Sequence, residues 1–121
     1  MAKRIQQGDG WRLGVNPDAS DYTGLVGTDA WSVELTSIEL KDFCRLALQL
    51  ADTMKAIASE LMDEERISCE AESESLWLEA EGFPETYSLR LMLLTGRRVE
   101  GEWASSAVPG LLGAIRLIDA F

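Results

Sequence analysis

Acidic side chains that surround one tryptophan are the residues of this chain with the most evident chemistry. Glutamates alternate with apolar residues along two stretches, Ile67–Glu72 and Leu76–Glu81. A period of two is typical of β-strands whose two faces differ in polarity. The strands therefore place on one outward face the side chains of Glu70, Glu72, Trp77, Glu79, Glu81, Arg90 and Glu102.

Clustered carboxylates can bind a divalent cation or receive a basic partner. We predict no metal site and no cofactor, because glutamates on neighbouring strands splay apart whereas metal sites draw ligands from loops. A pairing of Glu70 with Glu79 places like charges opposite each other, which favours an approaching cation. A solvated face is the simplest interpretation, and a basic protein segment is the ligand that we predict otherwise.

Trp77 is the aromatic residue whose position in the pattern places it among the acids. Arg90 is expected to lie across its ring as a cation-π contact, and the same ring is a candidate anchor for a partner. Trp11, Trp31 and Trp103 fall on apolar positions and are predicted to fill the core.

The chain lacks several residue types and motifs that common catalytic sites use. It contains no histidine, so the usual general base, zinc ligand and triad member are all missing. Cys44 and Cys69 fall on apolar faces, where burial keeps a thiol unreactive. Gly8-Asp9-Gly10 lacks the third glycine of a dinucleotide motif. We predict that the protein is not an enzyme.

The net charge of the chain also indicates which kind of partner to expect. The chain has 21 acidic residues against 11 lysines and arginines, a formal net charge of -10. Because nucleic-acid affinity comes largely from phosphate neutralisation, nucleic acid is not the partner that we expect. Arg97 and Arg98 at a predicted hairpin tip are interpreted as solubilising. With Arg90, they are the cations nearest to a nucleic-acid surface in the alternative interpretation.

Two strand-then-helix repeats are predicted to hold these residues. In the first repeat, alternation and turn residues indicate three antiparallel strands at 11–15, 22–26 and 31–35. Thr36-Ser37-Ile38-Glu39 matches a capping box. It begins an amphipathic helix of about seven turns that runs through Leu61 and Met62 and ends at Asp63–Arg66.

Four antiparallel strands are predicted in the second repeat. A turn at Glu74-Ser75 sets Ala71 opposite Leu78 and Cys69 opposite Ala80. A loop over 82–85 sets Leu78 opposite Leu89 and Trp77 opposite Arg90. A turn over 95–97 pairs Leu93 with Val99, Leu89 with Trp103 and Arg90 with Glu102.

The last helix is apolar nearly all round, which indicates that it is either buried on several sides or an association surface. Its apolar residues are Leu111, Leu112, Ile115, Leu117, Ile118 and Phe121. The whole chain, residues 1–121, is predicted to be one α+β domain of about seven antiparallel strands and two helices. With neither a signal peptide nor about 20 consecutive apolar residues, we predict a cytoplasmic protein that does not span a membrane.

Several segments are similar to those of a known family. They are Gly10-Trp11-Arg12-Leu13-Gly14, the runs 61–65, 67–73 and 77–82, Tyr87-Ser88-Leu89-Arg90 and Leu94–Arg98. Together they resemble a small cyanobacterial family, domain-of-unknown-function family 1818. The resemblance implies a fold similar to the single-stranded-DNA-binding regulators of the Whirly and transcriptional-coactivator type, in which sheet and helix alternate twice.

We predict a small acidic, non-catalytic protein-interaction module. It uses either the acidic sheet face around Trp77 or the apolar C-terminal helix, with an unidentified protein or a second copy of the chain as partner. The alternative is a single-stranded nucleic-acid-binding transcriptional regulator, a role that the fold resemblance implies.

Overall fold

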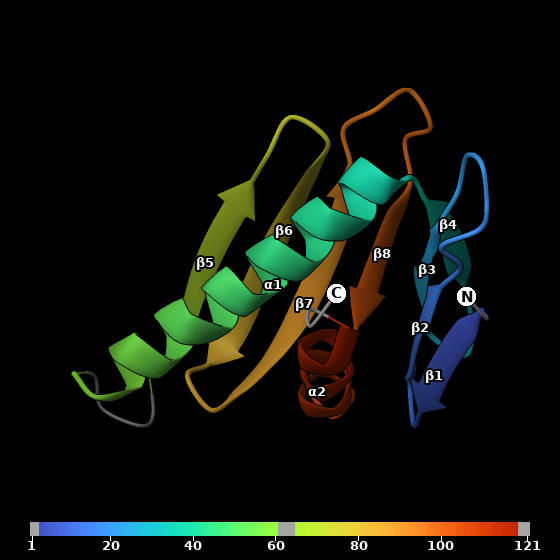
Figure 1. The fold of residues 1–121 in the computed structure, drawn as a ribbon. Coiled ribbons are helices and arrows are strands. Elements are labelled where there is room, and N and C mark those ends of the chain that lie inside the picture. The colour runs from blue at the N-terminus through green and yellow to red at the C-terminus, as the bar shows by residue number, and fades with distance from the viewer. Residues whose placement is uncertain (1–2, 61–64, 119–121) are drawn as a thin grey trace.

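Two four-stranded antiparallel sheets and two helices make up the fold, in the order sheet, helix, sheet, helix (Figure 1). The computed structural model describes residues 3–60 and 65–118. The elements are β1 (Arg4–Gly8), β2 (Trp11–Val15), β3 (Gly24–Gly27), β4 (Ser32–Leu35), α1 (Ser37–Ala58), β5 (Ile67–Glu72), β6 (Leu76–Phe83), β7 (Thr86–Leu93), β8 (Glu100–Trp103) and α2 (Val108–Ile118). The predicted α+β class and the two repeats are confirmed.

The strand count of seven was wrong, because β1 adds an eighth strand. β1 pairs with β2 so that Gly8 lies opposite Trp11, which makes Asp9-Gly10 a two-residue turn. Gly10 has a φ of 83°, a backbone conformation that glycine adopts readily. β1 is mostly exposed, so its sequence lacks the alternation that reveals a half-buried strand.

The capping box that begins α1 is confirmed. The Glu39 N–H donates to the Thr36 hydroxyl at 3.2 Å, and the Thr36 N–H donates to the Glu39 carboxylate at 2.9 Å. The helix has 22 residues and ends at Ala58, earlier than predicted. Residues 61–64, which we had placed within the helix, lie outside the described residues.

Strand pairing in the second sheet differs from the prediction at one hairpin. The predicted pairs between β5 and β6 and between β7 and β8 are confirmed, including Ala71 with Leu78 and Arg90 with Glu102. Between β6 and β7, the predicted pairing of Leu78 with Leu89 and of Trp77 with Arg90 was wrong. Pro84-Glu85 alone forms the turn, so Leu78 lies opposite Leu91 and Glu79 opposite Arg90. A shift of two residues leaves every side chain on its predicted face.

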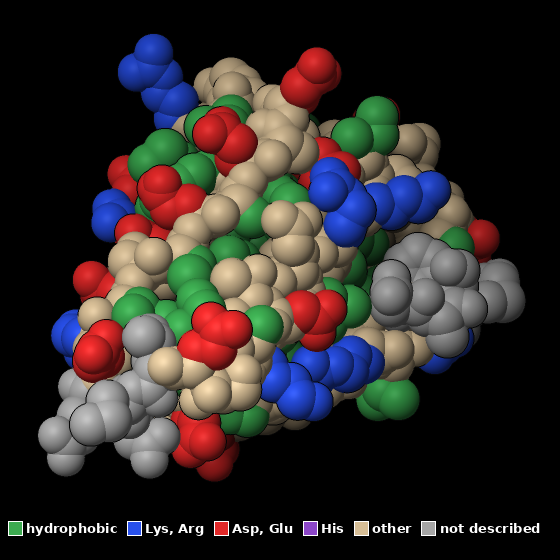
Figure 2. Space-filling view, turned by 90° about the vertical axis from the view of Figure 1, so that its left-hand side faces the viewer, with side chains coloured by type: hydrophobic (Ala, Val, Ile, Leu, Met, Phe, Trp, Pro, Cys, Tyr) green, Lys and Arg blue, Asp and Glu red, His purple; other side chains and the backbone are tan. Residues whose placement is uncertain are grey.

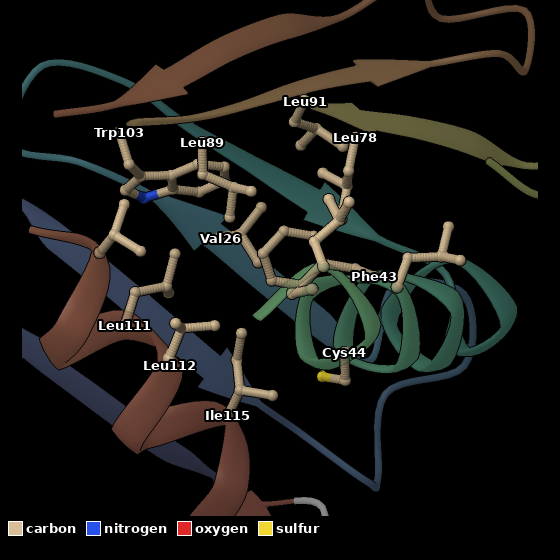
Figure 3. Packing of buried hydrophobic residues seen from close by; sticks show 14 of the residues in the cluster. Val26, Phe43, Cys44, Leu78, Leu89, Leu91, Trp103, Leu111, Leu112 and Ile115 are labelled. Carbon is tan, nitrogen blue, oxygen red and sulfur yellow. The ribbon is translucent and has the colours of Figure 1, made fainter. Parts of the chain in front are cut away.

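The core lies between the helices and the inner faces of both sheets. α1 crosses one face of the β5–β8 sheet (Figure 1), and one buried cluster includes residues from both sheets and both helices. Figure 3 shows Leu111, Leu112 and Ile115 of α2 on the side of this cluster opposite Leu78 and Leu91.

Trp103 is fully buried, as predicted, and donates its indole N–H to the Gly27 carbonyl at 2.8 Å. Trp31 and Phe43 pack beside it, with ring centroids 5.0 and 5.6 Å away. Trp11 and Trp31 are only partly buried and pack against the edge of the core.

α2 is largely buried, which reduces the apolar surface that we had considered for association. Leu111, Leu112, Ile115 and Ile118 are buried, and Leu117 is 66% exposed. Phe121 lies outside the described residues. No helix in the described part of the chain is long and apolar enough to cross a bilayer.

Candidate protein-interaction surface

The side chains of β5–β8 that point away from both helices form what we call the outer face. Along β6, side chains that face the core and side chains that point outward alternate strictly, with Leu76, Leu78 and Ala80 fully buried. The outer face comprises Ser68, Glu70, Glu72, Trp77, Glu79, Glu81, Ser88, Arg90, Met92, Glu100 and Glu102. The face therefore contains every residue predicted for the acidic surface, and also Met92 and Glu100.

Two cross-strand rows organise the centre of the outer face. One row runs Glu70, Glu79, Arg90, Glu102, and the other runs Glu72, Trp77, Met92, Glu100. The like-charge pair of Glu70 and Glu79 is present as predicted, since these two residues lie directly opposite each other. Such a pair raises the electrostatic energy of the sheet unless a cation lies nearby.

Trp77 is partly exposed on this face. The guanidinium carbon of Arg90 lies 6.0 Å from the centroid of the Trp77 ring, so the predicted cation-π contact is present at the outer limit of its usual range. Met92 lies opposite Trp77 on the neighbouring strand and is also partly buried. The indole and the thioether form an apolar strip that is bordered by Glu72 and Glu100.

Arg90 is held by the acids around it. Its guanidinium donates to Glu100 at 2.9 Å. This hydrogen bond, followed by the charges of Glu100, Glu79 and Glu102, raises the pKa of Arg90 above its ordinary value. Sequence reasoning missed Glu100, although its position two residues before Glu102 on the same strand was a usable signal.

The remaining carboxylates fall into two groups. Glu79 accepts a hydrogen bond from the Ser68 hydroxyl at 2.9 Å, and Glu81 forms an exposed ion pair with Arg66 at 3.3 Å. Glu70 and Glu72 are exposed and form no ion pair with any described residue. The negative charge of the outer face is therefore least compensated along β5.

The space-filling view from the side where β5 lies in Figure 1 shows acidic side chains spread over the molecule (Figure 2). Hydrophobic side chains are visible between them, next to a band of backbone and uncharged polar atoms. In the part of the chain that is described, no group of three or more histidine, cysteine or acidic residues is close enough to hold a metal ion.

Arg97 does not project freely from the hairpin tip, so our interpretation of it as a solubilising residue was wrong. Its guanidinium forms an ion pair with the buried Glu39, donates to the Glu34 carbonyl and lies 4.9 Å from the ring centroid of Tyr22. Only Arg98 of the two is exposed. The structure thus does not bring Arg90, Arg97 and Arg98 together on one surface, because Arg90 lies on the outer face and Arg97 bonds to the start of α1.

A family model described as a domain of unknown function, DUF1818, matches residues 6–118. A crystal structure of a protein with unknown function from Prochlorococcus sp. NATL2A, labelled as a DUF155 family member, has a TM-score of 0.89 and 26% sequence identity. The similarity covers 95% of this chain and 97% of the Prochlorococcus chain. A search of curated proteins gave no match.

Proposed function

Because the chain belongs to the domain-of-unknown-function family DUF1818, whose description gives no activity, we propose a function from the outer face: the protein is a non-catalytic module that binds a basic protein segment. The observation that carries the proposal is the position of Trp77. A partly exposed indole lies beside Met92 on a mainly acidic sheet face that neither helix covers.

This combination suits a polypeptide ligand with lysine or arginine side chains. Interfaces are enriched in tryptophan, methionine and arginine, and a few central anchors dominate their energy. Trp77 and Met92 provide the apolar centre, and Glu70 and Glu72 provide unpaired charge beside it. Charge complementarity speeds association and excludes acidic partners.

The absence of catalysis in this proposal follows from residue types. The sequence has no histidine, Cys44 is buried in the core, and Cys69 is partly buried on the inner side of β5. Cys69 lies opposite Ala80 and not opposite Trp77 in the sheet register, and Cys44 lies on α1. The outer face offers mainly carboxylates and the apolar strip of Trp77 and Met92, which recognise cations and apolar side chains.

Binding to a peptide array tests the proposal. The array carries segments of mixed sequence that contain lysine and arginine, and matched segments in which these are replaced by glutamate. We expect the basic segments alone to bind, and the tightest of them, labelled with fluorescein, to serve in anisotropy titrations. Trp77→Ala should weaken that binding about tenfold or more, as expected for a central anchor.

The matched control is Ile38→Ala, which removes an apolar side chain that is 70% exposed on α1, away from the outer face. It should leave the affinity unchanged. Both variants should keep a melting temperature close to that of the parent chain, since neither side chain is fully buried. If basic segments do not bind, or if Trp77→Ala and Ile38→Ala bind equally well, the proposal is wrong.

A further inference from the structure

The open edge of β5 provides a second feature beside the outer face. β5 is the terminal strand of its sheet and pairs only with β6 among the described residues. In Figure 1 it lies at the far side of the sheet from β8. A terminal strand presents a row of N–H and C=O groups that another extended chain can join.

The hydrogen-bond pattern identifies the groups that face the open edge. At the hairpin, the Ser73 N–H donates to the Leu76 carbonyl at 2.9 Å. Because bonded and non-bonded pairs alternate along an antiparallel ladder, Ala71, Cys69 and Ile67 bond to β6. The N–H and C=O groups of Ser68, Glu70 and Glu72 therefore point away from β6.

The inner side of the same strand is incompletely covered. Ala71 is buried, but Ile67 and Cys69 are only partly buried, whereas Leu78 and Ala80 on β6 are fully buried. α1 packs against both strands and so leaves part of the inner side of the edge strand in contact with solvent. An additional strand beside β5 would cover these apolar atoms with its own inward side chains.

The negative charge on β5 determines which kind of strand can pair with its open edge. Every residue whose backbone faces the open edge has its side chain on the outer face, and two of the three are unpaired glutamates, Glu70 and Glu72. Pairing β5 with β5 of a second copy would bring these acids together, which is unfavourable. Lysine or arginine at the facing positions would form cross-strand pairs with them.

We infer that β5 binds its partner by strand addition, and that the partner is an extended segment in which basic residues alternate with apolar ones. The inference rests on the proposed function and specifies the partner: its basic side chains lie over the outer face, and its apolar side chains lie over Ile67 and Cys69. A segment of about six residues matches the length of β5, since each residue advances about 3.3 Å.

Amide hydrogen exchange on the intact chain tests the mode of binding directly. The probe is a capped peptide of about eight residues in which lysine and valine alternate. Strand addition should slow exchange at the amides of Ser68, Glu70 and Glu72 by at least about tenfold when the peptide saturates the protein. A peptide of the same composition with all its lysines before its valines is the control and should protect them much less.

A pair of variants at one position provides a second test. Glu70→Gln and Glu70→Pro both remove the charge, but only proline also removes the N–H that faces the open edge. β5 should tolerate this proline, because that N–H does not bond to β6. We expect Glu70→Pro to bind the alternating peptide at least tenfold more weakly than Glu70→Gln. The exchange measurement on the parent chain decides the matter if the proline variant does not fold.

The outcomes separate the two proposals. If the peptide binds in a Trp77-dependent manner but the three amides are not protected, strand addition is wrong and the proposed function stands. If the chain sediments as a dimer and the same amides are protected without peptide, a second copy occupies the edge and the basic-strand assignment is overturned. If no basic peptide binds, both proposals fail.

Discussion

Arg97, in the turn between β7 and β8, forms an ion pair with Glu39, the capping-box residue in the first turn of α1, 58 positions earlier in the chain. The Glu39 side chain is only 4% exposed, and Arg97 covers it. The same carboxylate accepts hydrogen bonds from the Thr36 N–H at 2.9 Å and the Thr95 hydroxyl at 3.0 Å. One buried carboxylate thus joins the start of the long helix to the second sheet.

Arg97→Ala should lower the free energy of unfolding, because it leaves the buried Glu39 charge without its cation. Breaking a buried ion pair costs about 3 to 5 kcal/mol, and we expect about 1 to 3 here because Arg97 is itself 30% exposed. Urea unfolding measures the change. Arg98→Ala, at the exposed neighbouring position, is the control and should change it by less than about 0.5 kcal/mol. Equal losses in the two variants would show that the ion pair does not contribute.

The lowered pKa of Asp42 leads us to expect that the stability of the fold depends on pH. Burial raises its pKa, but hydrogen bonds from Ser75, Ser73 and Arg45 outweigh burial and hold the pKa below its ordinary value of 3.8. A carboxyl whose pKa is lower in the folded state stabilises the fold above its unfolded pKa. That stabilisation is lost as the pH falls through the folded pKa.

Ser75→Ala removes the hydroxyl that donates to Asp42 at 2.7 Å. The variant should therefore be less stable than the parent at neutral pH, by about 1 to 2 kcal/mol, and the difference should shrink below pH 3.8. Urea midpoints across this pH range measure it. Ser88→Ala is the control, since the Ser88 hydroxyl donates to a backbone carbonyl and its loss should not vary with pH. A constant difference for Ser75→Ala would contradict the role assigned to Asp42.

Two glycines of α2 should respond in opposite directions to alanine. A Cβ at Gly113 would meet no atom within 4 Å, so Gly113→Ala should stabilise the helix by about 0.5 to 1 kcal/mol. A Cβ at Gly110 would approach Nε1 of the Trp11 indole to 2.4 Å, so Gly110→Ala should destabilise the protein by about 1 to 3 kcal/mol. Thermal unfolding of the two variants measures the shifts. If both raised the melting temperature, the Trp11 indole would not lie against Gly110.

The sequence predicted the faces of the second sheet well, because alternation depends only on the parity of each strand. The hairpin between β6 and β7, whose register we predicted wrongly, is an example. Its register was wrong by two residues, yet Trp77 and Glu79 still lie on the predicted face. Register itself depends on which residues form the turn, and Gly82-Phe83-Pro84-Glu85 allows more than one choice.

The sequence pattern could not predict contacts between elements that are far apart in the chain. Arg97 follows Gly96 in a polar turn, and nothing local indicates that its side chain reaches the start of α1. β1 was missed for a related reason, since its side chains are mostly solvent-exposed and carry no apolar period. The Asp9-Gly10 turn was the local signal that could have revealed it.

The positions of the arginines allow a test of the alternative function, the binding of single-stranded nucleic acid. A single-strand-binding surface combines a basic groove with aromatic rings on which bases stack. Arg97 bonds to Glu39 instead, and Arg90, the cation beside Trp77, is paired with Glu100 among further glutamates. We therefore expect no binding of a fluorescein-labelled single-stranded oligonucleotide. Its anisotropy should stay unchanged as protein is added into the micromolar range at low salt, where phosphate contacts are strongest.

Glu100→Gln, which removes the ion pair of Arg90, is the informative variant. If the parent chain binds the oligonucleotide and Glu100→Gln binds it more tightly, Arg90 contacts phosphate, and nucleic acid replaces a basic protein segment as the ligand of the outer face.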